Sequence, residues 1–242
     1  MRHAEEPVTL IIGASGQGIG PAVAERLAHD GHRLFLVGRS ATALEALAER
    51  VKDVAPSVWL HPGDATKPRI IRHVVDDVLL HYGRLDNLVY TPSASSFGPF
   101  LEESPKDLEE HLKVSVEAPW LWMQTAIPQM LASNGGRLIF MNATAGKRGF
   151  ADMAAFSAAK HALHGLVEAV AREHRRAGIQ PVSLILDGML DHAGMRERFP
   201  DKEDWSDTIS MEAVAGAVSY LCRQDVRGMS HELWLTPSNE RW

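Results

Sequence analysis

Short apolar runs and amphipathic stretches alternate along the whole chain. The apolar runs lie at residues 8–12, 34–37, 58–60, 88–90, 138–141, 182–186 and 232–235. Brief, continuous runs that are rich in β-branched and other large aliphatic residues are typical of strands buried on both faces. The pattern therefore predicts a sheet of about seven strands.

Between these runs, apolar residues recur with the spacing of an α-helix. The predicted helices cover about 21–29, 44–51, 70–83, 105–131, 154–177 and 211–223, and the fourth is interrupted near Pro119. Regular alternation of strand and helix is expected when helices cover both faces of a mostly parallel sheet. We find no internal repeat and no linker in the sequence. Residues 1–242 are therefore predicted to form a single doubly wound α/β domain.

One stretch shows neither the apolar runs of a strand nor the apolar spacing of a helix. The segment GMLDHAGMRERFPDKEDWSD begins at Gly188 and precedes the last predicted helix. A loop of this length inside a compact domain usually serves function. We expect residues 188–210 to form a loop on the substrate side of a site.

The segment LIIGASGQGIGPAV joins the first predicted strand to the first predicted helix. Glycines at such a turn let the backbone approach a pyrophosphate, and the helix N-terminus supplies N–H groups and positive potential. A tight turn without a ligand is the alternative, but the placement at the first strand–helix junction favours dinucleotide binding. The predicted cofactor contacts in this loop are Gly13, Ser15, Gly16, Gly18, Ile19 and Gly20.

The end of the second predicted strand bears on which dinucleotide binds. The sequence there is VGRS, with Arg39 and Ser40 at its end. A site selective for NAD usually has an acidic residue here, whereas an arginine suits the 2′-phosphate of NADP. These residues favour NADP(H) over NAD(H), although Arg39 could also be a solvated charge at a helix start. Asp64, in GDAT after the third strand, is expected near the adenine end.

Composition and charge exclude several other classes. The chain has 242 residues, of which 45% are hydrophobic and 23% charged, and its formal net charge is −6 with no basic block. This argues against nucleic acid as a partner. The lone Cys222 fits a reducing cytoplasm. The N-terminal MRHAEEPVTLIIG has the features of neither a signal peptide nor a membrane span, so no membrane partner and a cytoplasmic location are expected.

Several motifs together resemble the short-chain dehydrogenase/reductase family over nearly the full length. They are GASGQGIG, GRS, GDAT, LDNLVY, GGRLIFMNATAG, FSAAK and AGIQPVSLILDG. The resemblance implies a Rossmann-like domain that moves hydride between NAD(P)(H) and a small carbonyl or alcohol. It also implies a homodimer or homotetramer. Trp120 and Trp122 lie on the long fourth helix, which often packs against another subunit in this family, but core packing explains them equally well.

The sequence departs from the family at the residues that carry its chemistry. Phe156 occupies the position of the catalytic tyrosine, and Ala143 that of the substrate-binding serine, unless Thr144 takes it by a shift of one residue. Ser115 occupies the position of the proton-relay asparagine, and only Lys160 is retained. The glycine motif also differs, since Gly13 lies one residue upstream of the first glycine or Ala14 replaces it. The family's NNAG motif after the fourth strand is replaced by YTPS, and its Pro-Gly after the sixth strand by Asp187-Gly188.

These changes remove the family's usual acid. Phenylalanine cannot donate a proton, and alanine cannot hydrogen-bond through its side chain. Since general acid–base help is typically worth ~10²–10⁴-fold in rate, an unmodified mechanism is not available. The resemblance implies that Lys160 still binds the nicotinamide ribose. Thr144 and Tyr90 are the candidate replacement catalytic groups, with a turn hydroxyl and a packing aromatic as their plain alternatives.

The favoured interpretation is an atypical NADP(H)-dependent oxidoreductase that acts on a small organic molecule. A dehydratase or isomerase that uses Asp187, Asp191 or His192 is one alternative, and a nucleotide-binding protein without catalysis is another. His161 and His164 lie one helical turn apart, but a metal ion would need three or four convergent ligands, so no metal site is predicted.

Overall fold

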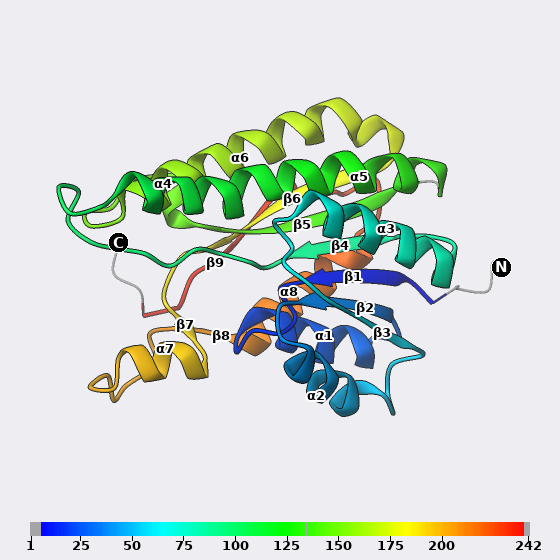
Figure 1. Ribbon diagram of the computed structural model, residues 1–242, viewed down its shortest axis with the longest axis horizontal. Helices are drawn as coiled ribbons and strands as arrows, with labels where there is room; N and C mark the ends of the chain where they lie inside the picture. The colour runs from blue at the N-terminus through cyan, green and yellow to red at the C-terminus, as the bar shows by residue number, and fades with distance from the viewer. Residues whose placement is uncertain (1–5, 134, 240–242) are drawn as a thin grey trace.

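Seven parallel strands form the centre of the computed structural model, which describes residues 6–133 and 135–239 (Figure 1). The strands are β1 (Val8–Ile12), β2 (Arg33–Gly38), β3 (Val58–Pro62), β4 (Asn87–Tyr90), β5 (Gly136–Ala143), β6 (Ile179–Leu186) and β9 (Glu232–Leu235). Their order is β3-β2-β1-β4-β5-β6-β9, and every neighbouring pair is parallel. The predicted α/β fold is confirmed. Residues 1–5, part of the segment in which no targeting sequence was predicted, lie outside the described residues.

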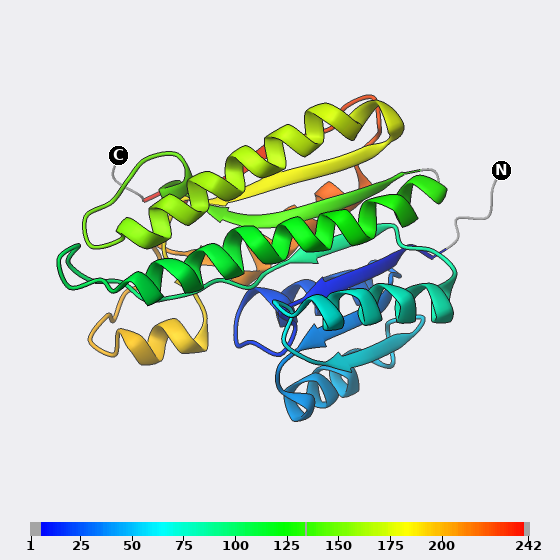
Figure 2. The same ribbon diagram turned by 45° about the horizontal axis from the view of Figure 1, so that its top comes forward.

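Helices cover both faces of this sheet. On one face lie α1 (Ile19–His29), α2 (Ala41–Val51) and α8 (Met211–Arg223), and on the other lie α3 (Pro68–Tyr82), α5 (Ala118–Ala132) and α6 (Ala154–His174) (Figures 1 and 2). Alternate strand residues pack into the two layers, as Leu34 and Phe35 do on β2. Burial on both faces explains why the strands are continuous apolar runs.

The long fourth helix is interrupted by a π-turn. α4 (Pro105–Leu112) leads into the π-helical η1 (Lys113–Glu117), and α5 follows directly. Pro119 has no N–H for the carbonyl of Ser115, four residues earlier, and its ring would clash with that carbonyl. The helix widens at this point instead of breaking, which places the predicted interruption a few residues before Pro119.

The tryptophans of α5 have different environments. Trp122 is fully buried, and its Nε1 donates to the Ala65 carbonyl at 3.0 Å. Trp120 is 50% exposed. Trp122 is therefore a core residue, and only Trp120 is available to a neighbouring subunit.

The segment expected as a loop contains short regular elements. They are β7 (Leu190–Asp191), α7 (Ala193–Arg198) and β8 (Ile209–Ser210), and β7 pairs with β8 in a small parallel sheet. The 3₁₀ turns η2 (Thr144–Gly146) and η3 (Arg175–Ala177) flank α6. Elements of two to six residues are too short to show a period in the sequence, which is why none was predicted here.

The strand order reverses at β1, which lies between β2 and β4. Ligands of open parallel sheets bind outside the carboxyl ends of the strands at this reversal. The loops that follow β1, β2 and β4 meet there, and α7 lies at the same end of the sheet (Figure 2). Among the residues described, none of the helices combines the length and apolar character that crossing a membrane requires.

Candidate active site

The loop between β1 and α1 depends on glycine at two positions. Gly13 has φ of +89°, and the N–H groups of Gly13 and Ala14 both donate to the Val37 carbonyl at 2.9 Å. A Cβ on Gly13 would lie 2.3 Å from Thr91 Oγ1, and one on Gly20 would lie 2.4 Å from the Gly13 carbonyl oxygen. A side chain at either position would push the loop away from β4 or from α1. Gly13, and not Ala14, supplies the left-handed backbone.

The N-terminus of α1 is left open toward the loop. Its cap residue is Gly18, and its first turn contains no acidic residue. Among the described residues, no side chain caps its first N–H groups. Unpaired N–H groups and the helix dipole together attract an anion. The arrangement matches the requirements of a pyrophosphate group.

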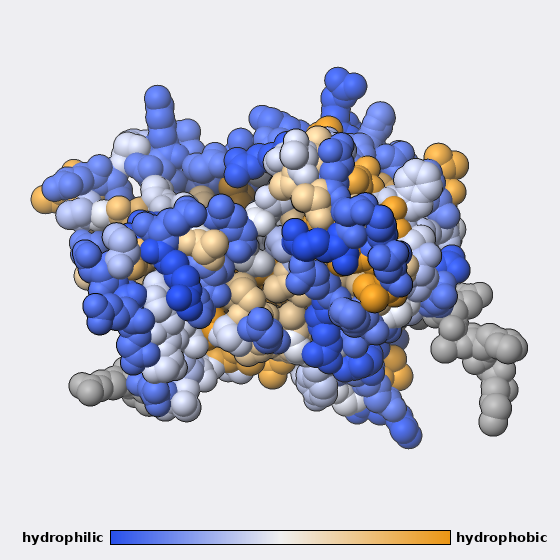
Figure 3. Space-filling model, turned by 90° about the horizontal axis from the view of Figure 1, so that it is seen from below, coloured by the Kyte–Doolittle hydropathy of each residue, from blue (hydrophilic) through white to orange (hydrophobic). Residues whose placement is uncertain are grey.

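A cavity of about 650 Å³ opens beside this loop. The predicted cofactor residues that line it are Gly13, Ser15, Gly16, Gly18, Ile19, Gly20, Arg39 and Asp64. Residues of α4, η1 and α7 complete the wall. In Figure 3, hydrophilic side chains stand on either side of a paler central strip on the face that carries α1, α2 and α8.

At the β2 end of the cavity, the backbone leaves no room for an acidic side chain. A Cβ on Gly38 would lie 2.3 Å from Ser15 Oγ. Arg39 is exposed, lines the cavity and forms no ion pair with the described residues. Ser40 does not line the cavity: its Oγ caps α2 by accepting from Ala43 N at 3.2 Å. Arg39 is therefore a cation without an ion-pair partner among the residues that the structure describes.

Asp64 is held in a fixed orientation at the carboxyl end of β3. Its Oδ1 accepts from Thr66 N at 3.0 Å and from Thr66 Oγ1 at 2.8 Å. Burial alone would raise the pKa of Asp64, but these hydrogen bonds outweigh it and the pKa is lowered. The residue is an ionised acceptor at neutral pH.

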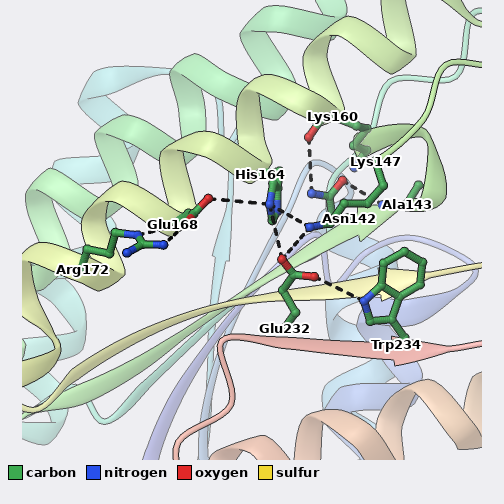
Figure 4. Close-up of polar contacts among 9 residues, drawn as sticks. All are labelled: Asn142, Ala143, Lys147, Lys160, His164, Glu168, Arg172, Glu232 and Trp234. Atoms are coloured by element: carbon green, nitrogen blue, oxygen red, sulfur yellow. Dashed lines mark hydrogen bonds and ion pairs between the residues drawn. The ribbon is translucent and has the colours of Figure 1, made fainter.

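Lys160 lies on α6, is 3% exposed and is not among the residues that line the cavity. Its Nζ donates to the Met141 carbonyl at 2.9 Å and lies 5.6 Å from the centre of the Phe156 ring. Burial lowers the pKa of Lys160 to about 8. Asn142 Nδ2 donates to the Lys160 carbonyl at 3.3 Å, which joins β5 to α6 (Figure 4). The ammonium group is buried and close to its titration range.

An aromatic cluster surrounds the position of the family's tyrosine. The Phe97 and Phe156 rings meet edge to face at 5.4 Å, and the His111 ring lies 5.7 Å from Phe156. His111 is fully buried, and its Nε2 lies 3.0 Å from both Ser96 Oγ and the Ser96 carbonyl. Sequence reasoning missed His111, because a histidine inside the acidic run DLEEHL is typical of a solvated helix face.

Thr144 and Asp187 form a buried pair. Thr144 Oγ1 donates to Asp187 Oδ1, and Thr236 Oγ1 donates to Asp187 Oδ2 at 3.0 Å. The Asp187 N–H also donates to the Leu235 carbonyl at 2.9 Å. These bonds connect the ends of β5, β6 and β9. The proton of the Thr144 hydroxyl is already committed to Asp187.

Tyr90 does not face the cavity, contrary to its interpretation as a catalytic candidate. It is 1% exposed, and its hydroxyl donates to the Val114 carbonyl at 2.7 Å. Burial raises its pKa. Val114 lies in the π-turn, where the Ala118 N–H bonds to the Lys113 carbonyl instead. Tyr90 therefore satisfies a carbonyl that the widened helix leaves free, and it cannot deliver a proton to a substrate.

Ser115, at the family's asparagine position, is buried in the same π-turn. It is 1% exposed, and its Oγ has no hydrogen-bond partner among the described residues. Its carbonyl also receives no bond from Pro119, which has no N–H. The hydroxyl oxygen of Ser115 is therefore available to an additional donor.

A second polar cluster ties α6 to the edge strand β9 (Figure 4). Lys147 Nζ donates to Glu232 Oε1 at 2.5 Å and lies 2.8 Å from His164 Nε2. His164 Nε2 lies 3.3 Å from Glu232 Oε1, and Trp234 Nε1 donates to Glu232 Oε2 at 3.3 Å. No sequence pattern predicts this cluster, because its members come from three separate segments of the chain. Within 6–133 and 135–239, no group of three His, Cys, Asp or Glu residues is arranged to hold a metal ion.

The comparisons with known proteins agree with this geometry. Residues 7–204 match the family model described as short chain dehydrogenase. The chain belongs to the short-chain dehydrogenase family. This confirms the family inferred from the motifs and, with it, the class of NAD(P)-dependent oxidoreductases.

Three similar proteins illustrate the range of the family. The uncharacterized oxidoreductase YxjF of Bacillus subtilis (strain 168) is 31% identical over 195 residues, which cover 80% of this chain and 75% of that protein. The cyclic-di-GMP-binding biofilm dispersal mediator protein of Escherichia coli (strain K12) is 29% identical, with 93% and 94% coverage. The crystal structure of a metagenomic short-chain oxidoreductase in complex with NADP has a TM-score of 0.82 and 26% identity, with 97% and 98% coverage.

Proposed function

We propose that this chain binds NADP(H) and transfers hydride to or from a small organic substrate without a tyrosine acid. The observation that carries the proposal is the glycine-lined cavity, with the open end of α1 on one side and the unpaired Arg39 at its β2 end. The nicotinamide cofactor supplies or accepts the hydride when bound. The chain's own residues bind and orient the cofactor.

Binding and orientation fit the residues of the cavity. Gly13 and Gly20 let the backbone approach the cofactor's phosphates. The N–H groups at the start of α1 would donate hydrogen bonds to the phosphate oxygens. Arg39 would pair with a 2′-phosphate, and Asp64 would accept a hydrogen bond at the adenine end. The NADP in the metagenomic relative, which is 26% identical, supports this choice of cofactor.

Proton transfer must differ from the family's relay. Phe156 has no proton to give, Ala143 has no donor, and the Thr144 hydroxyl is engaged with Asp187. Lys160 is a titratable group near this position, since burial lowers its pKa to about 8 and its Nζ lies 5.6 Å from the centre of the Phe156 ring. We propose that Lys160 positions the ribose and that water or the substrate itself supplies the proton. An electrophilic substrate, such as a quinone-like or iminium carbon, suits this site best.

A nucleotide-binding protein without catalysis is the second candidate. The absence of side-chain donors at Phe156 and Ala143 favours it, and the E. coli relative is named for cyclic-di-GMP binding. A dehydratase or isomerase is less well supported. Asp187 accepts from two threonine hydroxyls, and Asp191 is paired with Arg196 at 2.6 and 2.8 Å, so neither carboxylate is free to act as a base. Of the three candidate groups for this chemistry, that leaves His192.

Cofactor titration tests the proposal. Quenching of tryptophan fluorescence should show NADPH binding at least about tenfold tighter than NADH, because the 2′-phosphate adds a charge-assisted contact worth more than about 1.4 kcal/mol. Arg39→Asp should reverse the preference. Arg176→Asp, in η3 at the opposite end of the sheet, is the matched control and should leave both affinities unchanged. Equal binding of the two cofactors would contradict the NADP(H) preference, and binding of neither would overturn the proposal.

Assembly and location are further proposals. We propose a homodimer or homotetramer, supported by the exposed Trp120 on α5 and Leu108 on α4. We also propose the cytoplasm as its location. The single Cys222 supports this, because one cysteine cannot form an internal disulfide, and free cysteines are typical of a reducing compartment.

A further inference from the structure

His192 is a polar side chain without a partner on the wall of the cavity. It follows β7 and precedes the first turn of α7. Its Nδ1 is buried, and its ring makes no hydrogen bond with the described residues. Buried polar atoms are normally paired, so Nδ1, on the side of Gly194, is an unusual exception. The other ring nitrogen, Nε2, is beside the glycine loop, 3.5 Å from the position of a Cβ on Gly18.

The imidazole lies directly over the anion-binding end of α1. A Cβ on Gly18, the cap residue of α1, would lie 3.2 Å from both Cγ and Cδ2 of His192. A Cβ on Gly194 would lie 3.4 Å from His192 Cε1. The ring is therefore enclosed between the glycine loop and the start of α7. A group bound at the open N–H groups of α1 would be in contact with it.

We propose that His192 binds the cofactor's pyrophosphate in its protonated form, so that cofactor binding takes up a proton. The inference rests on the proposed function, because it assigns a residue to the same cavity. It extends that function by giving His192 a contribution to the pH dependence of cofactor affinity.

The charges around His192 support a neutral ring before binding. Burial lowers the pKa of His192, and the neighbouring Asp191 opposes this only in part. The carboxylate of Asp191 is already paired with Arg196. The dipole of α1 presents its positive end to the ring, which also disfavours a second positive charge.

The other charged groups on the cavity wall are of both signs. Arg39, Lys113 and Arg198 are positive, whereas Asp64 and Glu110 are negative. None of them forms a hydrogen bond with the His192 ring. A pyrophosphate adds negative charge directly at Gly18, so it would raise the pKa of His192 above its value in the free protein.

The direction of the pH effect follows from this order of pKa values. Between the pKa of the free protein and the higher pKa of the complex, the complex holds one proton more. Affinity should therefore increase as pH falls through that interval, by at most about tenfold per pH unit for one proton. The 2′-phosphate of NADPH acts in the opposite direction, because pairing with Arg39 favours its fully ionised form.

Titration calorimetry in buffers of different ionisation enthalpy measures the protons exchanged on binding. With NADPH at neutral pH, we expect the wild-type protein to take up more protons than His192→Gln, by up to one. His73→Gln, an exposed histidine on α3, should match the wild type. The variant and the wild type bind the same 2′-phosphate, so its contribution cancels in the difference.

A second measurement needs no variant. NADH lacks the 2′-phosphate, so its binding to the wild-type protein should show proton uptake alone. NADPH binding with equal proton exchange in wild type and His192→Gln would overturn the inference and leave the proposed function intact. If His192→Gln does not fold, NADH binding to the wild type without proton uptake would overturn it. Failure to bind either cofactor would overturn both the inference and the proposed function.

Discussion

Lys160 and Phe156 show how the role of a residue depends on its neighbours. The lysine retains its position on α6, but the ring beside it carries no hydroxyl whose pKa it could lower. Its Nζ is instead anchored to the Met141 carbonyl. A retained motif residue is therefore evidence for the fold and for cofactor binding before it is evidence for the family's chemistry.

We expect the double substitution Phe156→Tyr with Ala143→Ser to leave generic ketone reduction weak. The new hydroxyl would stand in a cluster filled by Phe97 and His111, and Ser115 is too short to act as the relay amide. The gain in NADPH oxidation with simple ketones should stay below the ~10²-fold that a working general acid supplies. The single substitution Ala143→Ser is the control. A gain of ~10²-fold or more would show that the two side chains alone had disabled the site.

Individual elements depend on contacts that their own sequences do not reveal. The π-turn η1 follows from Pro119, and its released carbonyl is satisfied by a tyrosine from β4, 24 residues earlier in the chain. A tyrosine at the carboxyl end of a strand near a cofactor is an attractive acid by topology. Here its hydroxyl donates a hydrogen bond to the π-turn that joins α4 to α5.

Tyr90→Phe should test that structural role. We expect a loss of about 1–3 kcal/mol in the free energy of unfolding, because the buried Val114 carbonyl loses its hydrogen bond. The NADPH dissociation constant should not change. Tyr220→Phe, at a tyrosine that is 54% exposed, should cost little in stability. Urea unfolding measures the free energy of unfolding, and a cofactor titration measures the dissociation constant. A large loss of cofactor affinity with unchanged stability would show that Tyr90 belongs to the cofactor site.

Across the whole molecule, histidines with lowered pKa values make the free energy of unfolding depend on pH. His32 is 2% exposed, and its Nδ1 lies 2.8 Å from Thr9 Oγ1. Burial lowers its pKa below the ordinary value of 6.5, despite the opposing charges of Asp30 and Asp86. Burial also lowers the pKa values of His164 and His192. The unfolded chain therefore binds protons more readily than the folded one just below that value.

The free energy of unfolding should consequently fall as pH decreases from about 7.5 to about 5.5. These histidines favour the folded state in their neutral form, so their contribution is complete above pH 6.5 and is lost below it. His32→Gln should flatten this decline, whereas His73→Gln should not. Urea unfolding at the two pH values measures the difference. A decline that is unchanged in His32→Gln would assign it to other groups.

The sequence by itself determined the α/β class, the parallel sheet, the glycine loop and the position of Arg39. These features follow from local chemistry: a strand buried on both faces must be apolar throughout, and a backbone with positive φ at a strand–helix turn must use glycine. Each can be read within a short window, as at Gly13. The loss of the family's general acid at Phe156 was also evident from the sequence, because phenylalanine has no ionisable proton.

Only the tertiary structure decided which polar groups remain free. Tyr90, Thr144 and His192 all lie near the carboxyl ends of strands in the sequence, but the first donates to Val114 and the second donates to Asp187. The ring of the third has no hydrogen-bond partner within the described part of the chain. The clusters around His111 and His164 likewise join segments that are distant along the chain. Burial and hydrogen bonding between such segments arise from the packed fold, so no local pattern encodes them.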